Sequence, residues 1–193
     1  MLLAATAAGA LRAEPLSYRL DAANTFVHFE LLHFGTSTVR GRFGPIEGSV
    51  LLDRAAGRGE LGLRIPTTTL STGVPLFDAR VRQADMLATE AFPEAYFVAS
   101  RFRFDGDKLA EVRGEFTLHG VSQPLSLTAR RFGCREEDVA GGPEKGRFEV
   151  CGGDFDADIT RSDFGLNYGL PFIANRVHLQ IQVEARRPIQ PKR

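Results

Sequence analysis

The sequence predicts an all-β protein: an antiparallel β-barrel of about eight strands with one short helix at its rim. Apolar and polar residues alternate strictly over 177–184, as in a strand with one face buried and the other in water. Segment 26–32 alternates likewise, with Val27, Phe29 and Leu31 on one face. Turn-forming residues separate further segments of this kind at hairpin spacing. The first and last strands have the same alternation and could pair, so we expect the sheet to close on itself and lose its free edges. A sandwich is the alternative.

Turns that contain Gly, Pro, Asn or Asp separate the predicted strands. The strands span residues 18–21, 26–32, 39–43, 46–53, 61–65, 97–104, 112–118, 125–129, 155–159 and 177–184. The period of two is lost in the middle of the chain, where Pro75 is the expected first residue of a short helix that ends at Ala84. One side of this helix is expected to lie against the barrel rim. Further along, Arg161 and Asp163 are expected to share the inward side of a strand.

Length and composition limit the classes of function. A chain of 193 residues fits a single domain that buries roughly 70% of its unfolded surface. Its 24 basic and 24 acidic residues balance, and no block of like charge is long enough to bind nucleic acid, which is therefore not an expected partner. Trp is absent whereas Phe occurs 15 times, and Phe rings line apolar space without adding a hydrogen-bonding group. No segment approaches the ~20 consecutive apolar residues of a membrane span.

The first ten residues are small and apolar, and Ala8-Gly9-Ala10 resembles a signal-peptidase site. No Lys or Arg precedes this apolar run, and the run is shorter than a usual signal core. Residues 1–13 are therefore either a signal peptide, with the true start upstream, or a frayed N-terminus. The first alternative is favoured and predicts an exported protein. Residues 14–193 are expected to form one barrel domain.

The two cysteines also bear on whether the protein is exported. Gly141-Gly142-Pro143 lies midway between Cys134 and Cys151, so a hairpin folded there would set the two opposite each other on neighbouring strands. A disulfide would stabilise the fold by about 3 kcal/mol and fits an oxidising compartment. The alternative is two unrelated buried thiols. A zinc site is disfavoured because no further ligand stands nearby at metal spacing.

Several segments carry a resemblance to a known family. They are TFVHF (25–29), HFG (33–35), VRGRF (39–43), EG (47–48), ADML (84–87), FPEAYF (92–97), GEFTLHGV (114–121), QPL (123–125) and RSDFG (161–165). Together, and in this order, they make the chain similar to the YceI-like family over roughly residues 18–185. Members of that family resemble lipocalins: an elongated antiparallel barrel whose internal tunnel holds a polyisoprenoid chain, usually in the periplasm.

The resemblance implies a lipocalin-like barrel that stores or carries an isoprenoid lipid, such as a prenylated quinone, with no established catalysis. The chain departs from the family at the helix, where Pro75 to Arg80 stand in place of a stretch rich in His and acidic residues. Met86 and Leu87 replace an aromatic–aliphatic pair, and the two cysteines are not a general family feature. These departures lie mainly at the expected rim, so the sequence leaves the ligand head group open.

Inward residues of the predicted strands form the candidate ligand site, with Gly41, Gly114 and Ala157 as small residues that leave room between the rings. Each buried CH₂ contributes ~0.8 kcal/mol, so a few isoprene units outweigh the cost of immobilising the chain. A polar anchor is therefore not needed. The candidate ligand-binding residues are Phe29, Leu31, His33, Val50, Leu52, Leu61, Leu63, Ile65, Phe97, Phe116, Leu118, Leu127, Phe155, Ile159, Arg161, Leu179 and Ile181.

Two other functions are compatible with the sequence. An enzyme at the barrel mouth would use His33 or the Arg161/Asp163 pair, but no Gly-x-Ser-x-Gly elbow or triad context accompanies them. In the structural interpretation, Arg161 and Asp163 form an ion pair that stabilises one end of the barrel. In the functional interpretation, they form a polar rim that recognises a carbonyl or phosphate group. A filled barrel with a structural or stress-related role is the third possibility. We expect no cofactor and no metal, a periplasmic or secreted monomer or homodimer, and transient contact with a membrane or a membrane redox protein.

Overall fold

The structure, a computed structural model, describes residues 15–141 and 145–189. The predicted leader, residues 1–13, and the turn residues Gly142 and Pro143 lie outside these residues. The elements of the described chain are β1 (Leu16–Leu20), η1 (Ala22–Asn24), β2 (Phe26–His33), β3 (Ser37–Phe43), β4 (Glu47–Asp53), β5 (Arg58–Pro66), η2 (Thr67–Thr69), α1 (Pro75–Val81), β6 (Glu94–Asp105), β7 (Lys108–Leu118), β8 (Val121–Val139), β9 (Gly146–Thr160), η3 (Arg161–Phe164) and β10 (Arg176–Pro188).

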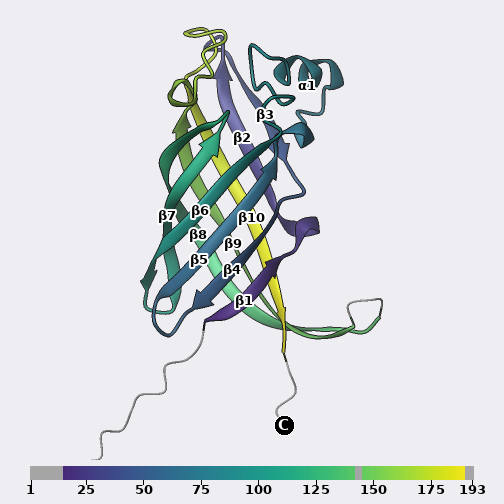
Figure 1. Ribbon diagram of the computed structural model, residues 1–193, viewed down its shortest axis with the longest axis vertical. Helices are drawn as coiled ribbons and strands as arrows, with labels where there is room; N and C mark the ends of the chain where they lie inside the picture. Colours follow the sequence, from purple (N-terminus) through teal and green to yellow (C-terminus); the bar gives the residue numbers. More distant parts are fainter. Residues whose placement is uncertain (1–14, 142–144, 190–193) are drawn as a thin grey trace, which may run out of the picture.

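These strands form one antiparallel sheet, and eight of them close it into a barrel (Figure 1). The order around the ring is β1-β4-β5-β6-β7-β8-β9-β10, and pairing between β1 and β10 completes it. β2 pairs with the same edge of β10 as β1 does, farther along, so that Val27 faces Ile181. The predicted closed barrel of about eight strands with one short helix is confirmed.

A short 3₁₀ turn separates β1 from β2 because its residues offer the backbone other partners. The Asp21 carboxylate accepts hydrogen bonds from the Ala23 amide and the Asn24 side chain, each at 3.0 Å. The Thr25 hydroxyl donates to the Asp21 carbonyl at 2.8 Å. The chain therefore bends here and resumes on the same edge of β10, while the other edge of β1 pairs with β4 and that of β2 with β3.

The wall is least regular beside β3. Within the described residues, the second edge of β3 makes one bridge, between Arg42 and Ser71, whereas β4 pairs with β5 over seven positions. The segment that runs from η2 to α1 lies beside this edge. Here the connection between β5 and β6 completes the wall at the upper end of Figure 1.

Most strands differ from their predicted ranges by a few residues, and the larger differences lie in β8, β9, α1 and η3. β8 and β9 are much longer than expected and form a hairpin whose far part leaves the barrel at its lower end (Figure 1). Helix α1 ends at Val81 and not at Ala84, and its Leu76 faces solvent with 86% of its surface exposed. Arg161 and Asp163 belong to the 3₁₀ helix η3 and not to a strand. Here the chain turns away from the sheet and enters the loop to β10.

The interior divides into two halves. Buried side chains that include Tyr18, Leu52 and Val112 pack together at the end where β1 closes the ring. The expectation that Gly41 leaves a void is wrong, because a Cβ there would lie 2.5 Å from Cζ of Phe29, whose ring occupies the space. None of the described helices is long and apolar enough to cross a bilayer.

Candidate functional site

A cavity of about 190 Å³ occupies the half of the barrel that is nearest α1. Its walls are the inward faces of β2, β3 and β5–β10, and its upper rim is built by η2, α1 and the loop between η3 and β10. Alternation along each strand turns these side chains inward. The predicted residues that line the cavity are Phe29, Leu31, His33, Leu63, Ile65, Phe97, Phe116, Leu118, Leu127, Ile159, Arg161, Leu179 and Ile181.

Four predicted residues do not line the cavity: Val50, Leu52, Leu61 and Phe155. They belong to the packed half, where Leu52 and Phe155 are buried in the core and the other two pack against it. These residues do point inward as expected. At their level the inward side chains, Tyr18 among them, belong to the hydrophobic core cluster or pack against it.

The cavity also has lining residues that the predicted set lacks. Some lie on strands next to predicted ones, and the others lie in the irregular segments of the rim, where periodicity gives no signal. These residues are Val27, Val39, Phe43, Thr67, Leu70, Thr72, Phe77, Val81, Met86, Leu87, Ala95, Leu125, Leu166, Tyr168, Ile173 and Val177. Val27 and Val177 share the alternation of their strands with predicted residues, which was the available signal for them.

Arg161 is buried, with 8% of its surface exposed, and it is the one Asp, Glu, Lys or Arg among the described lining residues. The expected ion pair with Asp163 is wrong: the Asp163 side chain is exposed, and the Arg161 guanidinium donates to three backbone carbonyls. These bonds run from Nε to Ala174 (2.9 Å), from Nη1 to Leu166 (2.5 Å) and from Nη2 to Ile173 (2.9 Å). Burial lowers the pKa of Arg161 below its ordinary value. Arg161 thus holds the rim loop in place.

Helix α1 is tied to the same rim. The buried Asp78 carboxylate accepts hydrogen bonds from the amide (2.7 Å) and the hydroxyl (2.6 Å) of Thr72. The hydroxyl hydrogen bond is the main reason that the pKa of Asp78 lies below its ordinary value. Across the mouth, Cζ of Arg80 lies 4.5 Å from the ring centroid of Tyr168, and Arg80 also forms an ion pair with Asp85 at 2.6 Å. This contact joins α1 to the loop.

Polar groups are scarce inside the cavity. The Thr67 hydroxyl donates to the Phe92 carbonyl at 2.7 Å, and Thr72 and Arg161 are engaged as described. His33 meets the edge of the Phe34 ring at 4.5 Å, and within the described residues its imidazole makes no hydrogen bond. The described lining includes no Ser, Cys, Asp, Glu or Lys. The lining therefore offers no activated nucleophile beside a base.

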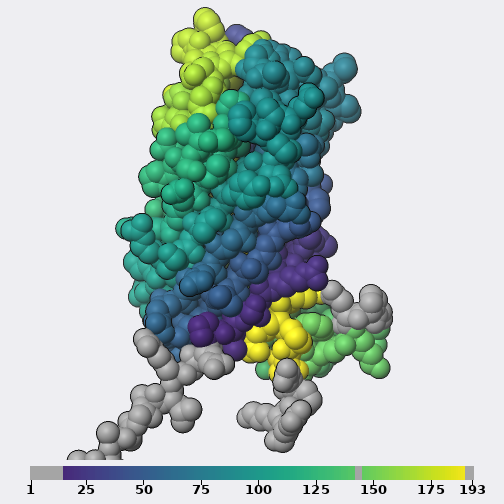
Figure 2. Space-filling model, viewed as in Figure 1, coloured from purple at the N-terminus to yellow at the C-terminus, as the bar shows by residue number. Residues whose placement is uncertain are grey.

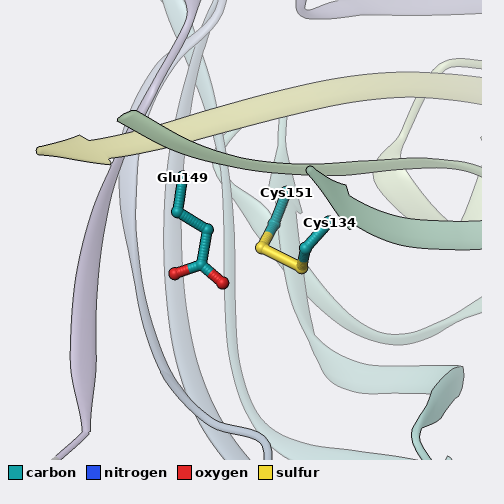
Figure 3. Close-up of side chains that lie close together, drawn as sticks. All are labelled: Cys134, Glu149 and Cys151. Atoms are coloured by element: carbon teal, nitrogen blue, oxygen red, sulfur yellow. A yellow bond between two sulfur atoms is a disulfide. The ribbon is translucent and has the colours of Figure 1, made fainter. Parts of the chain in front are cut away.

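Cys134 and Cys151 are opposite each other in the β8–β9 ladder and form a disulfide with an S–S distance of 2.09 Å. Figure 3 shows Glu149 beside this bond, and one ligand atom from each of the three residues lies within 4.8 Å of the others. A disulfide sulfur is not a thiolate, so this group offers a metal ion only the carboxylate. That carboxylate accepts hydrogen bonds from Tyr18 (2.9 Å) and Arg187 (2.7 Å) at the closed end of the barrel.

Known proteins share this sequence and this architecture. Residues 18–185 match the YceI-like domain. Protein YceI of Escherichia coli O157:H7 is 32% identical over 170 residues, which cover 86% of this chain and 85% of that protein. Burkholderia cenocepacia BcnA superposes with a TM-score of 0.67 at 20% identity, over 86% of this chain and 98% of that one.

A second solved structure is a polyisoprenoid-binding domain from Saccharophagus degradans. It gives a TM-score of 0.65 at 18% identity, over 89% of this chain and 98% of that one. At this identity the two structures share the fold. The resemblance read from the sequence is confirmed by the domain match and by the identity to protein YceI. The chain belongs to the YceI-like family.

Proposed function

We propose that this protein binds a long apolar isoprenoid lipid in the barrel cavity, in order to store, transport or sequester it. The observation that carries the proposal is the cavity itself, which is lined mainly by apolar side chains and opens at one end of the barrel. An apolar cavity of ~150 Å³ stays free of water and accepts a benzene-sized ligand. The cavity of about 190 Å³ found here is in the same range, so it takes the apolar end of such a chain and not its whole length. The polyisoprenoid-binding domain with the same fold supports an isoprenoid as the apolar chain.

The packed half determines how such a chain would enter. Below the cavity, Leu52, Phe155 and Tyr18 are buried in the hydrophobic cluster and do not line the cavity, which supports a tube that is blind at this end. A ligand with one polar end then inserts its apolar end first and leaves its head group at the mouth. Burial of the methylene and methyl groups supplies the affinity at ~0.8 kcal/mol for each CH₂.

The head group would meet the polar side chains at the mouth. His33 has a ring without a hydrogen bond among the described residues, and Tyr168, which is 45% exposed, lines the cavity beside Arg80. Both can donate a hydrogen bond to a carbonyl oxygen. A prenylated quinone, with a carbonyl on its ring, suits them better than a plain polyprenyl hydrocarbon does.

Catalysis is not part of the proposal. Among the described residues the lining pairs no nucleophile with a base, and the buried cation Arg161 is committed to carbonyls of the chain itself. The disulfide fits an oxidising compartment, and with the leader-like N-terminus it supports a periplasmic or secreted location.

The test is displacement of a fluorescent apolar probe by a prenylated quinone. Ala95 lines the cavity and is almost fully buried, so Ala95→Phe places a ring inside it. We expect this variant to fold and to bind the quinone at least roughly tenfold more weakly, as loss of two or more buried CH₂ groups predicts. Val98→Phe, on the outer face of the same strand, is the matched control and should bind as the wild type does. Equal binding by both variants would refute the cavity as the site.

A further inference from the structure

Charged residues are missing from one end of the molecule. A quarter of the chain is Asp, Glu, Lys or Arg, yet segments 31–39, 65–77, 116–129 and 164–175 contain none. The first is the β2–β3 turn region, the second leads from the end of β5 into α1, the third spans the β7–β8 turn, and the fourth is the rim loop. All four contribute to the upper end of the barrel in Figure 1, around the mouth of the cavity.

The same segments expose large apolar side chains. Phe34, Phe172 and Leu76 are 60%, 64% and 86% exposed, and each stands on a different segment. Figure 2 shows the loop and the α1 region next to each other at this end, with the tip of the β2–β3 turn between them. Large exposed apolar groups on loop tips around an apolar cavity indicate an interaction surface.

This surface is held by defined contacts. The Phe34 amide donates to the Phe172 carbonyl at 2.7 Å, and the two rings stack with their centroids 5.9 Å apart. A bridge between His33 and Ile173 continues the pairing. The turn and the loop therefore present their aromatic rings as one unit.

The few charges near this end are mostly neutralised. Arg80 forms an ion pair with Asp85, and the Arg82 guanidinium donates to the Leu70 carbonyl. Glu90 is exposed. The opposite end has charged turns: the β4–β5 turn lies between Asp53 and Arg58, and the β6–β7 turn contains Asp105 and Lys108. The two ends of one barrel thus differ sharply in the surface they offer.

We propose that the uncharged end, formed by segments 31–39, 65–77, 116–129 and 164–175, docks on the surface of a lipid bilayer. The inference rests on the proposed function in one respect: the chain that enters the cavity comes from the membrane. Docked this way, the apolar tips lie at the boundary between head groups and acyl chains, where aromatic side chains are enriched. The mouth then faces the lipid phase, so a chain moves into the cavity without crossing water.

The chemistry favours a bilayer over a protein partner. Protein interfaces carry a polar rim and about one hydrogen bond per 100–200 Å², and they enrich Arg. The four segments contain no Arg or other charged residue, and the side chains at their most exposed tips are apolar. For the same reason the expected membrane is zwitterionic: no basic cluster is present in the four segments to attract anionic lipid.

The experiment is flotation with phosphatidylcholine vesicles. Leu76→Glu/Phe172→Glu places two carboxylates on the tips, and we expect the bound fraction to fall at least roughly tenfold. Val98→Glu is the matched control, since Val98 is 61% exposed but lies on the barrel wall, and it should bind as the wild type does. Adding anionic lipid or salt should leave wild-type binding unchanged.

A second measurement separates docking from lipid binding. The double variant should take up a prenylated quinone from detergent micelles as the wild type does, but should acquire it from vesicles more slowly by the factor seen in flotation. Wild-type uptake from micelles without any vesicle binding would overturn docking and leave the cavity proposal standing. Vesicle binding without quinone uptake from micelles or vesicles would support docking and overturn the cavity proposal. A concentration-dependent dimer that the double variant abolishes, together with no vesicle binding, would assign this end to a second copy of the chain and overturn docking.

Discussion

The two halves of this barrel are built by the same strands and yet have different interiors. β5 places Leu61 in the packed half and Leu63 in the cavity, two residues farther along the same face. β9 does likewise with Phe155 and Ile159. In the packed half the ring closes through β1, whereas in the open half β2 and β3 extend the wall and η2 and α1 cover its edge. The alternation along the strands is the same in both halves. The strands that complete the ring therefore decide, more than the alternation does, where this barrel is hollow.

The ends differ in their chemistry as well as their packing. The Tyr18 phenol, the Glu149 carboxylate and the Arg187 guanidinium form a hydrogen-bonded cluster at the closed end. Burial is the main cause that raises the pKa of Tyr18 above its ordinary value. At the open end, Arg161 uses its donors on carbonyls of the rim loop. Polar groups therefore close one end and frame an opening at the other.

The largest expected effect comes from truncating leucines in the two halves. Leu52→Ala in the packed half should cost about 3–5 kcal/mol of unfolding free energy, because it opens a new void in a filled core. Leu179→Ala borders an existing cavity and loses fewer contacts, so about 2–3 kcal/mol is expected. Urea unfolding measures both. Equal costs would remove the distinction between the halves.

The disulfide lies in the packed half of the barrel. Replacing both Cys134 and Cys151 by Ser should cost about 3 kcal/mol, since the bond restricts the unfolded chain over a loop of this length. Quinone uptake should stay unchanged, because neither cysteine lines the cavity. Reductant should lower the urea midpoint of the wild type and not that of the variant. Loss of uptake in a folded double variant would show that the halves are coupled.

Arg161 tests the open half in the same way. Arg161→Met leaves three carbonyls of the rim loop without their donor and should cost about 2–3 kcal/mol. Arg161→Lys, which can satisfy fewer carbonyls, should fall between Met and the wild type. Quinone affinity should drop in Arg161→Met as the rim loop loses order, and displacement of the fluorescent apolar probe measures it. A wild-type midpoint for Arg161→Met would show that the loop does not depend on this residue.

The smallest expected effect is a pH dependence at α1. The folded-state pKa of Asp78 lies below the ordinary value of 3.8, so its carboxylate contributes stability that is present above that value and is lost as the pH falls through the lower folded value. Asp78→Asn should lower the free energy of unfolding by about 1 kcal/mol at neutral pH, and it should reduce the further loss of stability at acid pH. Urea midpoints between neutral and acidic pH measure it. Parallel pH profiles for the two proteins would contradict the assignment.

The wall of the barrel could be predicted because alternation is a local property. Val27, Phe29 and Leu31 face inward whatever the rest of the chain does, and their pairing with the last strand followed from the same pattern. Whether the inside is filled depends on residues far apart in sequence, such as Tyr18 on β1 and Leu52 on the neighbouring strand β4, which no local pattern brings together. Phe155 was therefore expected in the ligand site although it lies in the packed core.

The rim escaped prediction for a different reason. Arg161 and Asp163 share a face in a strand, but in the 3₁₀ helix η3 they separate, one buried and the other exposed. Phe77, Tyr168 and Ile173 line the mouth from segments without a regular period. Their side chains are placed by tertiary contacts, including the hydrogen bonds of Arg161 and Asp78, which no local pattern encodes.

Native mass spectrometry of the intact protein tests the central claim most directly. Purified protein incubated with a prenylated quinone should carry one quinone mass per chain, and Ala95→Phe should carry much less under the same conditions while Val98→Phe matches the wild type. The account would be contradicted if the wild-type protein showed only its own mass after incubation and also carried no co-purified isoprenoid from the cells that produced it.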